Sequence, residues 1–452
     1  MLINQKKYQV LKLKLSFCIA IFTIATTFSQ KQWTLRECVD HALEKNISIQ
    51  QNKLNLESSK KDVDIARGNF LPNLNANTGG NFNFGTGFSP VTNTRVATSF
   101  FGGSINLSSG ITVFNGFRNT NTYKQAQLGV ESSKLDLQKI ENDISLLVVN
   151  GYLNILFAKE NLLVAKVQYE ISKTQIEAAQ ARYKSGVIPK GDFLNVESTA
   201  ATNLQSLISQ ENALDLALLN LAQLLQIPAE GFDVSPVDVG TPTADLFYKN
   251  ANSVYEKSLE RMPEIARAKL AIDNAALNIL ISKSAFLPSI SAQVGLTTNY
   301  GFNLNLPTGF SNTPFADQLV DNFGYGFGFN MNIPIFNRFQ TKNRVAQSII
   351  NKEIIETRLE SEKLALQQTI EQAFLDVKTA LKTYEAAKIS LASQQEAFKN
   401  AQERYNFGAM TLFDFDQVRT RLVNAEATLI RSKYDYVFKI KVLQFYSGDL
   451  TI

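Results

Sequence analysis

Beyond its first thirty residues, this chain is poor in the side chains that carry most enzyme chemistry. Its 452 residues include two cysteines and one histidine. Cys18 falls in an apolar run near the start, so only Cys38 and His41 remain afterwards. These two residues cannot build a disulfide, a zinc cluster or a Ser-His-Asp triad, and no glycine-rich phosphate loop is present. The sequence therefore predicts a protein that is not an enzyme and uses no cofactor or metal ion.

Long apolar runs and strong net charge are also missing. After residue 30, no stretch has the roughly 18 consecutive apolar residues of a spanning helix. Contact with a membrane would then require a closed barrel of strands, because only helices and closed barrels satisfy their backbone groups in lipid. A net charge of +4 is small for this length and argues against a nucleic-acid partner. Cys38 is predicted to be a small buried residue at the start of a helix.

The first residues have the composition of a secretory signal peptide. An apolar run from Leu15 to Ala25 is preceded by four lysines, namely Lys6, Lys7, Lys12 and Lys14. Small residues follow it, so we predict a signal peptide over residues 1–29 with cleavage near Ser29. A membrane anchor is the alternative, but this apolar run is too short to span a bilayer. Cys18 lies inside the run rather than at its end, which argues against a lipid-modified cysteine.

Two stretches of the chain repeat one pattern. RYKSGVIPKGDFLNVES, residues 182–198, and RYNFGAMTLFDFDQVRT, residues 404–420, share Arg, Tyr, Gly, Asp, Phe and Val at six of 17 places. FLPNLNA at 70–76 recurs as FLPSISA at 286–292, and VFNGF at 113–117 has a looser partner in IFNRF at 335–339. The offset grows from 216 to 222 residues, which indicates a small insertion. We infer one unit written twice.

Each unit is predicted to run helix, two strands, long helix, helix. For the first repeat, residues 30–230, we predict a helix from a capping box at Thr34 and Glu37 to about residue 68, strands at about 74–88 and 98–113, and helices over 118–184 and 192–226. A Pro-, Gly- and Asp-rich linker covers 231–244. For the second repeat, residues 245–452, we predict a helix, strands at about 289–304 and 323–335, and helices over 339–407 and 414–446.

The predicted strands alternate apolar residues with Asn, Gly and Ser. The clearest example is the apolar series Phe323, Tyr325, Phe327, Phe329 and Met331. Strands of about ten residues with one apolar and one uncharged polar face are typical of a barrel with lipid outside and water inside. A soluble sandwich is the alternative, but its strands are usually near six residues long. The stretches 86–97 and 305–322 are predicted to be outward-facing loops.

The long helices contain no proline and would each be a rod of roughly 100 Å. In their second halves, apolar residues recur every seven places: Val148, Ile155, Leu162, Tyr169, Ile176 and Tyr183, and then Ile370, Val377, Tyr384, Leu391, Phe398 and Tyr405. This repeat predicts packing along a supercoiled seam. The remaining surface is rich in Ala, Gln, Asn and Ser, which favours a hollow wall of helices. An ordinary dimeric coiled coil is the alternative.

The repeated 17-residue motif ends each long helix. Gly186 and Gly408 are predicted to take the left-handed conformation of a helix C-cap. Asp192 and Asp414 are predicted to be N-caps of the returning helices, with Gln417 in the capping-box position after Asp414. The motif therefore predicts a tight turn at the far end of each helical hairpin.

Four strands cannot close a barrel, so the chain is expected to assemble. Two chains would give eight strands with a filled interior, and three would give twelve with room for a pore. The hollow wall of helices favours three. In such an assembly each turn residue forms a ring around an axis, where rings of Asp or Tyr can gate and select by charge.

Together these features resemble the TolC family of outer-membrane efflux proteins. The resemblance rests on WTLRECVDHALEKN at 33–46, the two FLP motifs, the two RYxxGxxxxxDF turns and LLQIP at 224–228. It implies a mainly α fold with transmembrane β structure: a homotrimer with a twelve-stranded barrel in the outer membrane of a Gram-negative bacterium and a helical tunnel across the periplasm. It also implies docking with a periplasmic adaptor and an inner-membrane pump. By this resemblance, six turn residues hold the closed entrance and meet the adaptor: Tyr183, Gly186, Asp192, Tyr405, Gly408 and Asp414.

The second turn departs from the family pattern at two positions. The best-studied gate has an Arg two residues after the second Gly and an acidic ring three residues after the second Asp. This chain has Met410 and Gln417 there. Asp416 lies beside Gln417, on a helix face that we predict to be different. We therefore hypothesise a closure centred on Tyr405, or an apolar closure that involves Met410 and Phe413.

The predicted function is a passive outer-membrane exit duct of a tripartite efflux or type I secretion system. The alternative is a trimeric structural or adhesin-like coiled-coil protein of the outer membrane. That alternative would need fibrous repeats and surface segments longer than the loops at 86–97 and 305–322. An outer-membrane enzyme would need a nucleophile and a base near the barrel, whereas the only histidine lies in the first predicted helix.

Overall fold

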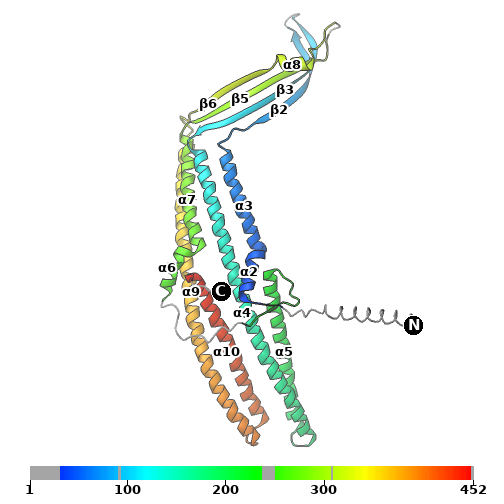
Figure 1. Ribbon diagram of the computed structural model, residues 1–452, viewed down its shortest axis with the longest axis vertical. Helices are drawn as coiled ribbons and strands as arrows, with labels where there is room; N and C mark the ends of the chain where they lie inside the picture. The colour runs from blue at the N-terminus through cyan, green and yellow to red at the C-terminus, as the bar shows by residue number, and fades with distance from the viewer. Residues whose placement is uncertain (1–30, 90–92, 237–249, 307–308, 449–452) are drawn as a thin grey trace, which may run out of the picture. The chain divides into compact units, whose positions relative to one another are not determined.

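The computed structural model describes residues 31–89, 93–236, 250–306 and 309–448, and the predicted signal peptide lies outside them (Figure 1). This part of the chain is mainly helical with one large sheet, as predicted. In chain order the elements are β1 (Gln32–Trp33), α2 (Leu35–Lys45), α3 (Ile47–Gly68), β2 (Asn75–Ser89), β3 (Thr94–Asn115), α4 (Arg118–Lys184), α5 (Lys190–Leu225), β4 (Asp233–Val234), α6 (Ala251–Arg261), α7 (Pro263–Lys283), the short 3-10 helix η1 (Ser284–Phe286), β5 (Ser289–Asn303), α8 (Phe315–Asp321), β6 (Gly324–Asn332), α9 (Gln340–Asn406) and α10 (Leu412–Ser447).

The chain divides into two compact units, and each takes residues from both sequence repeats. One unit contains residues 1–50, 141–258 and 368–452, and the other contains 51–140 and 259–367. The first therefore holds both helix reversals that carry the 17-residue motif. The second holds the large sheet. The two repeats are consecutive in the sequence, whereas each compact unit is a group of segments from both repeats that pack together in space.

The predicted first helix is two helices. Thr34 caps α2 as predicted, because its side chain accepts from the backbone N–H of Glu37 while the Glu37 carboxylate accepts from the Thr34 N–H. The helix then breaks at Asn46, which is buried. The Asn46 amide donates to the Leu224 carbonyl and accepts from the Ser48 N–H. Because a side chain that bonds to its own backbone competes with the helix, α3 starts anew at Ile47.

The large sheet is antiparallel, with strand order β2-β3-β5-β6. Asn75 pairs with Ser108 at one end of the first hairpin and Ser89 pairs with Thr94 at the other, so β3 begins four residues before the predicted strand at 98. β6 ends at Asn332, three residues short of the predicted 335. Pro334 accounts for that end, because proline has no N–H to donate to a neighbouring strand. β2 and β6 are the two edges of the sheet.

The long helices have the predicted extent. α4 and α9 contain 67 residues each, and α5 and α10 contain 36 each. Several of the heptad residues are fully buried, including Val148, Ile155 and Ile370. No helix in the described part of the chain combines the length and the apolar character needed to cross a membrane.

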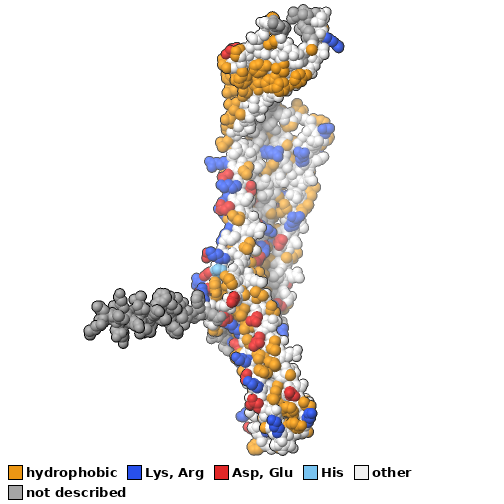
Figure 2. Space-filling model, turned by 90° about the vertical axis from the view of Figure 1, so that its right-hand side faces the viewer, with side chains coloured by type: hydrophobic (Ala, Val, Ile, Leu, Met, Phe, Trp, Pro, Cys, Tyr) orange, Lys and Arg blue, Asp and Glu red, His pale blue; other side chains and the backbone are white. Residues whose placement is uncertain are grey.

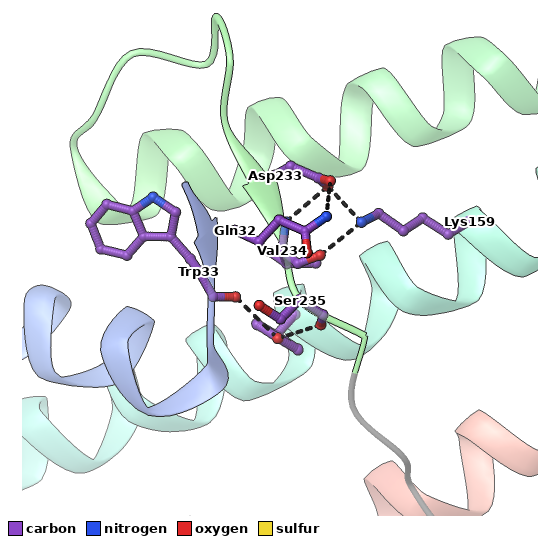
Figure 3. Close-up of polar contacts among 7 residues, drawn as sticks. Gln32, Trp33, Lys159, Asp233, Val234 and Ser235 are labelled. Atoms are coloured by element: carbon purple, nitrogen blue, oxygen red, sulfur yellow. Dashed lines mark hydrogen bonds and ion pairs between the residues drawn. The ribbon is translucent and has the colours of Figure 1, made fainter. Parts of the chain in front are cut away.

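A polar clasp ties the start of the described chain to the joint between the repeats (Figure 3). β1 pairs in parallel with β4, so residues 233 and 234 form a strand within the predicted linker, most of which lies outside the described residues. The buried Tyr152 hydroxyl donates to the carbonyls of Trp33 and Ser235. Lys159 donates to the Val234 carbonyl at 2.8 Å and forms an ion pair with Asp233 at 2.5 Å. This clasp holds both short strands against α4.

Cys38 is buried at the start of α2, as predicted. Burial raises the pKa of its thiol to about 12. Since the thiolate is the nucleophilic form, this cysteine is inert at neutral pH.

Candidate functional site

The two motif turns have the same backbone geometry. We call residues 185–189, between α4 and α5, the first turn, and residues 407–411, between α9 and α10, the second turn. Gly186 has a φ of +74° and Gly408 a φ of +72°, which confirms the predicted left-handed C-caps. The N–H groups of Gly186 and Gly408 donate to the carbonyls of Tyr183 and Tyr405, both at 3.0 Å.

The residue after each glycine completes a Schellman motif. The Val187 N–H donates to the Arg182 carbonyl at 2.9 Å, and the Ala409 N–H donates to the Arg404 carbonyl at 2.8 Å. These bonds satisfy helix-end carbonyls that would otherwise lack a partner. The shared Arg-Tyr-x-x-Gly pattern therefore marks one helix ending used twice.

The shared Tyr and Phe of the motif clip each hairpin together. Tyr183 stacks on Phe193 with ring centroids 5.7 Å apart, and Tyr405 stacks on Phe415 at 4.9 Å. Each pair joins the last turn of a long helix to the first turn of the returning one. Phe415 is buried and belongs to a cluster with Ala401 and Val418. At both turns, therefore, two residues of the motif form an aromatic stack between the two helices of the hairpin.

The predicted N-caps are wrong. Both aspartates occupy the third position of the returning helix. The cap of α5 is Pro189, which has no side-chain hydrogen bond, and the cap of α10 is Thr411. Thr411 Oγ1 accepts from the Asp414 N–H at 3.1 Å and donates to the Asp414 carboxylate at 2.7 Å. A carboxylate in the first turn still interacts favourably with the helix dipole, so the sequence signal was real but misassigned.

One hydrogen bond links the two hairpins near their turns. Arg182 Nη1, on α4, donates to the Tyr405 hydroxyl, on α9, at 3.0 Å. The guanidinium carbon lies 5.9 Å from the centre of the Tyr405 ring. Tyr405 is therefore held by an aromatic stack within its own hairpin and by a cation from the other one. The repeated motif did not by itself predict that Arg182 contacts Tyr405.

The remaining candidate residues fall in two different surroundings. Met410 is half-buried and packs on the Phe415 cluster together with Tyr405. Phe413 is 65% exposed. It faces a groove of about 600 Å³ between the starts of α5 and α10, whose lining includes Asp192, Asn195, Thr411, Phe413, Asp416 and Gln417. Met410 and Phe413 thus have different surroundings, whereas Asp192 and Gln417 border one groove.

A buried ion pair lies two turns into α10. Arg419 Nη2 is 3.2 Å from Asp416 Oδ1, and the two side chains are only 3% and 16% exposed. Among the described residues, none accepts a hydrogen bond from the Arg419 guanidinium. Burial raises the pKa of Asp416, an effect that the Arg419 charge opposes, and burial lowers the pKa of Arg419. An ion pair so poorly bonded is costly to keep buried.

Arg419 also borders a second groove, of about 670 Å³, between α4, α9 and α10. The exposed Leu163, Val167 and Ile171 form an apolar stripe along its α4 side. Glu426 lines the same groove, and burial raises the pKa of its carboxyl. The described residues contain no cluster of three or more His, Cys, Asp or Glu side chains arranged to bind a metal ion. The arrangement can hold the two hairpins together or release them; it offers no nucleophile with a base.

Sequence reasoning missed several contributors to this site. Phe193 and Phe415 were visible, because Phe is one of the six shared motif residues. Thr411 could have been found from the Thr-x-x-Asp spacing of a capping box. Arg182 is also a shared motif residue, but its contact with Tyr405 left no local signal, and neither did the burial of Arg419, because both depend on how helices distant in sequence pack together.

The chain matches the family described as outer membrane efflux protein over residues 38–225 and 254–448, well over half of its length. It is 20% identical to outer membrane protein TolC of Escherichia coli, over 87% of this chain and 77% of that protein. It is 26% identical to the pyoverdine export outer membrane protein OpmQ of Pseudomonas putida, over 74% of this chain and 67% of that protein. The predicted resemblance to the TolC family is confirmed.

Solved structures with the same fold are outer membrane channels. The Campylobacter jejuni CmeC channel superposes with a TM-score of 0.74 at 19% identity, covering 92% of this chain and 85% of that one. The open state of the Neisseria gonorrhoeae MtrE channel gives 0.65 at 20% identity, covering 92% and 89%. These matches show the fold of the chain, and the family match favours an exit duct over the structural or adhesin-like alternative. The chain therefore belongs to the outer membrane efflux protein family and is a non-enzymatic exit duct of an efflux system, located in the outer membrane.

Proposed function

We propose that three copies of this chain form the duct, with their sheets joined edge to edge into one twelve-stranded barrel. The observation that carries this proposal is the pair of free edges, β2 and β6, on a sheet whose apolar side chains are exposed in the single chain. On β6, Tyr325, Phe327 and Phe329 are 80%, 80% and 74% exposed. Lipid would cover that face, and three sheets of four strands leave room for a pore.

The two helical hairpins of each copy would form the wall of a periplasmic tunnel. They come from the two proposed repeats, residues 30–230 and 245–452, with residues 231–244 as the joint. Equal helix lengths in both hairpins support this arrangement, because a continuous wall requires neighbours that end together. In such a tunnel the turns reach the periplasmic end, where a periplasmic adaptor and an inner-membrane pump would dock and open it.

The gate, in this proposal, is a closure centred on Tyr405. The Arg182 hydrogen bond ties α9 to α4, so the second hairpin cannot move away from the first without breaking it. Met410 extends the apolar contact of the Tyr405 ring, and Gly408 lets the chain reverse directly beyond it. Tyr183, Gly186 and Asp192 shape the first turn, and Phe413, Asp414 and Gln417 shape the rim beside it.

Docking can be tested by photo-crosslinking in living cells. A photoreactive amino acid at Ala409, in the second turn, should capture a periplasmic hairpin adaptor, identified by mass spectrometry. The same residue at Asp273, which is exposed on α7 and lies in the other unit, serves as the matched control. If growing cells yield only copies of this chain, or partners on the cell surface, docking at the turns is wrong.

The gate can be tested by single-channel conductance in planar bilayers. Arg182→Met removes the cation from Tyr405 and should increase the fraction of time spent open. Arg404→Met is the control, because Arg404 is the corresponding residue of the second repeat and its side chain is exposed. Met410→Arg adds a charge to the apolar contact and should change gating as well. A closure centred on Tyr405 is excluded if Arg182→Met conducts like the unchanged protein.

A further inference from the structure

Helix α8 packs on the part of β5 that strand β6 does not reach. β5 has 15 residues, but only residues 289–297 pair with β6, which has nine. Residues 298–303 pair with β3 on one side and would have free backbone groups on the other. Free backbone groups at the edge of a sheet readily recruit another strand.

Three side chains from the segment around α8 cover that edge instead. Asn322 Nδ2 donates to the Asn299 carbonyl at 2.6 Å, and the Gly301 N–H donates to Gln318 Oε1 at 2.6 Å. Asn312 bonds to both backbone groups of Asn303, accepting at 2.8 Å and donating at 3.0 Å. These bonds fall on every second residue of β5, as the bonds of a neighbouring strand would. The segment 312–322, here called the edge cap, therefore replaces the missing length of β6.

The edge cap packs against the sheet, but part of its own surface is exposed in the single chain. Phe315 packs edge-on against Tyr300 with ring centroids 4.9 Å apart, and Gln318 is buried. Val320, by contrast, is 75% exposed. Helix α8 packs on β5 at the end of the sheet where the β5–β6 pairing stops, so Val320 is exposed next to that edge (Figure 1).

At the opposite edge of the sheet, strand β2 would have a length without a strand partner that matches the length of β5 covered by the edge cap. β2 has 15 residues, so pairing with all nine residues of another copy's β6 leaves six of them without a strand partner. Those six are as many as the β5 residues that the edge cap covers. Near the turn of the β2–β3 hairpin, Phe84 and Phe88 are 72% and 63% exposed.

The charged residues near the two edges have opposite signs, with Arg95 on β3 next to the edge strand β2. Arg95 is the only charged residue of β2 and β3, and it pairs in register with Phe88. Asp317 and Asp321 are the only charged residues between positions 298 and 324, and both are exposed. Figure 2 shows acidic and basic side chains on opposite sides of this otherwise uncharged end of the unit. A contact between unlike edges of successive copies gives a ring when the rotation between copies closes, as it does in the proposed trimer.

We propose that the edge cap of one copy docks on the turn end of the β2–β3 hairpin of the next copy, with Val320 against Phe88 and the two aspartates facing Arg95. This proposal rests on the proposed trimer and adds a contact beyond strand pairing. It explains why the second repeat carries an insertion in its loop. The edge cap both protects its own strand and completes the neighbouring edge.

Cysteine crosslinking between two co-expressed, differently tagged full-length chains tests the contact. One chain carries Arg95→Cys and the other Asp321→Cys, and a short bis-maleimide crosslinker is added to outer membranes. The native Cys38 is buried and should not react. A chain with both tags should appear on a denaturing gel at about ten times the yield given by Asp273→Cys, because apposed groups have a high effective concentration. Asp273 is an exposed acidic residue on α7 of the same unit.

Charge reversal supplies a second readout. In this experiment one chain carries Phe88→Cys and the other carries Val320→Cys. Adding Arg95→Asp to the first chain should lower the yield of the crosslink. Adding Asp317→Arg and Asp321→Arg to the second chain should then restore it. Native mass spectrometry of the same samples separates the outcomes. Trimers without either crosslink overturn the edge-cap contact but leave the duct intact. Chains that remain monomeric overturn the proposed trimer itself.

Discussion

The two motif turns have one backbone and two different environments. Both use a left-handed glycine, a Schellman pair of hydrogen bonds and a Tyr–Phe stack. Only the second turn has a side-chain cap, from Thr411, and a buried aromatic at its centre. Only the second carries the Asp416–Arg419 ion pair, since the residues 222 positions earlier are Leu194 and Glu197.

This difference separates what reverses a helix from what the proposed gate would need. Features common to both turns are those that any tight hairpin needs. Features confined to the second turn either bind it to neighbouring residues or bury a poorly hydrogen-bonded ion pair next to it. The proposed gate at Tyr405 therefore predicts that the second hairpin opens with a different free energy from the first. Hydrogen exchange of the hairpin amides can measure each hairpin separately, because local opening has its own free energy.

Truncation of the motif phenylalanine should separate the turns most strongly. Phe415→Ala is expected to lower the free energy of opening of the α9–α10 hairpin by about 3–5 kcal/mol, because it empties a buried site. Phe193→Ala should cost the α4–α5 hairpin clearly less, since Phe193 is only half-buried. Equal losses in the two hairpins would mean that burial does not distinguish them.

Removal of one ion-pair partner should have the next largest effect. Arg419→Ala leaves the Asp416 carboxylate buried without its counter-ion and should destabilise the second hairpin by about 3 kcal/mol. The double variant Asp416→Leu with Arg419→Met should recover most of that loss. Glu197→Ala is the matched change in the first hairpin and should cost little, because Glu197 is exposed. A double variant as unstable as the single one would argue against a costly buried charge.

The same pair predicts a pH dependence. Burial raises the pKa of Asp416 above its ordinary value of 3.8, so the folded hairpin holds that proton more tightly than the unfolded one. Its contribution to stability is therefore complete below pH 3.8 and is lost as the pH rises through the raised pKa. Relative to Asp416→Asn, the unchanged second hairpin should gain stability as the pH falls from neutral toward about 4. Parallel pH profiles would show that Asp416 titrates normally.

The shared glycines should respond alike. Gly186→Ala and Gly408→Ala each force a side chain into the left-handed region, at a cost of about 1–2 kcal/mol. A methyl group at either glycine would extend into open space, so the cost comes from the backbone alone. Hydrogen exchange should report similar losses in the two hairpins. A much larger loss at Gly408 would indicate that the second turn needs the glycine for more than reversal.

The helix caps should give the smallest difference. Thr411→Ala removes the side-chain acceptor from the Asp414 N–H and should cost about 1 kcal/mol. Pro189→Ala removes no cap hydrogen bond and should change the first hairpin by less than about 0.5 kcal/mol. Amide exchange at the first turn of α10 and of α5 reads out the two effects. The comparison fails if Pro189→Ala proves the more damaging change.

Much of the fold could be predicted because its signals are local. The alternation in β5 and the absence of proline in α4 are properties of neighbouring residues, and so is the positive φ that Gly186 and Gly408 allow. The break at Asn46 was missed because its local bond to the Ser48 N–H is one that many Asn residues inside helices could make, and the bond that holds Asn46 in place goes to Leu224, far along the chain. The caps at Asp192 and Asp414 were misplaced by three residues, since several polar side chains compete for the first turn of a helix.

The sequence by itself determined the duplication, the two long hairpins, the turns that end them and the family. Each of these rests on periodicity or on the conformational preference of single residues. Tertiary structure alone decided that Arg182 meets Tyr405, that Arg419 is buried beside Asp416, and that Gln318 and its neighbours replace a length of strand. These are contacts between residues that are local in space but not all local in sequence. Side-chain burial and hydrogen-bond partners depend on how helices and strands pack, and no short pattern encodes that.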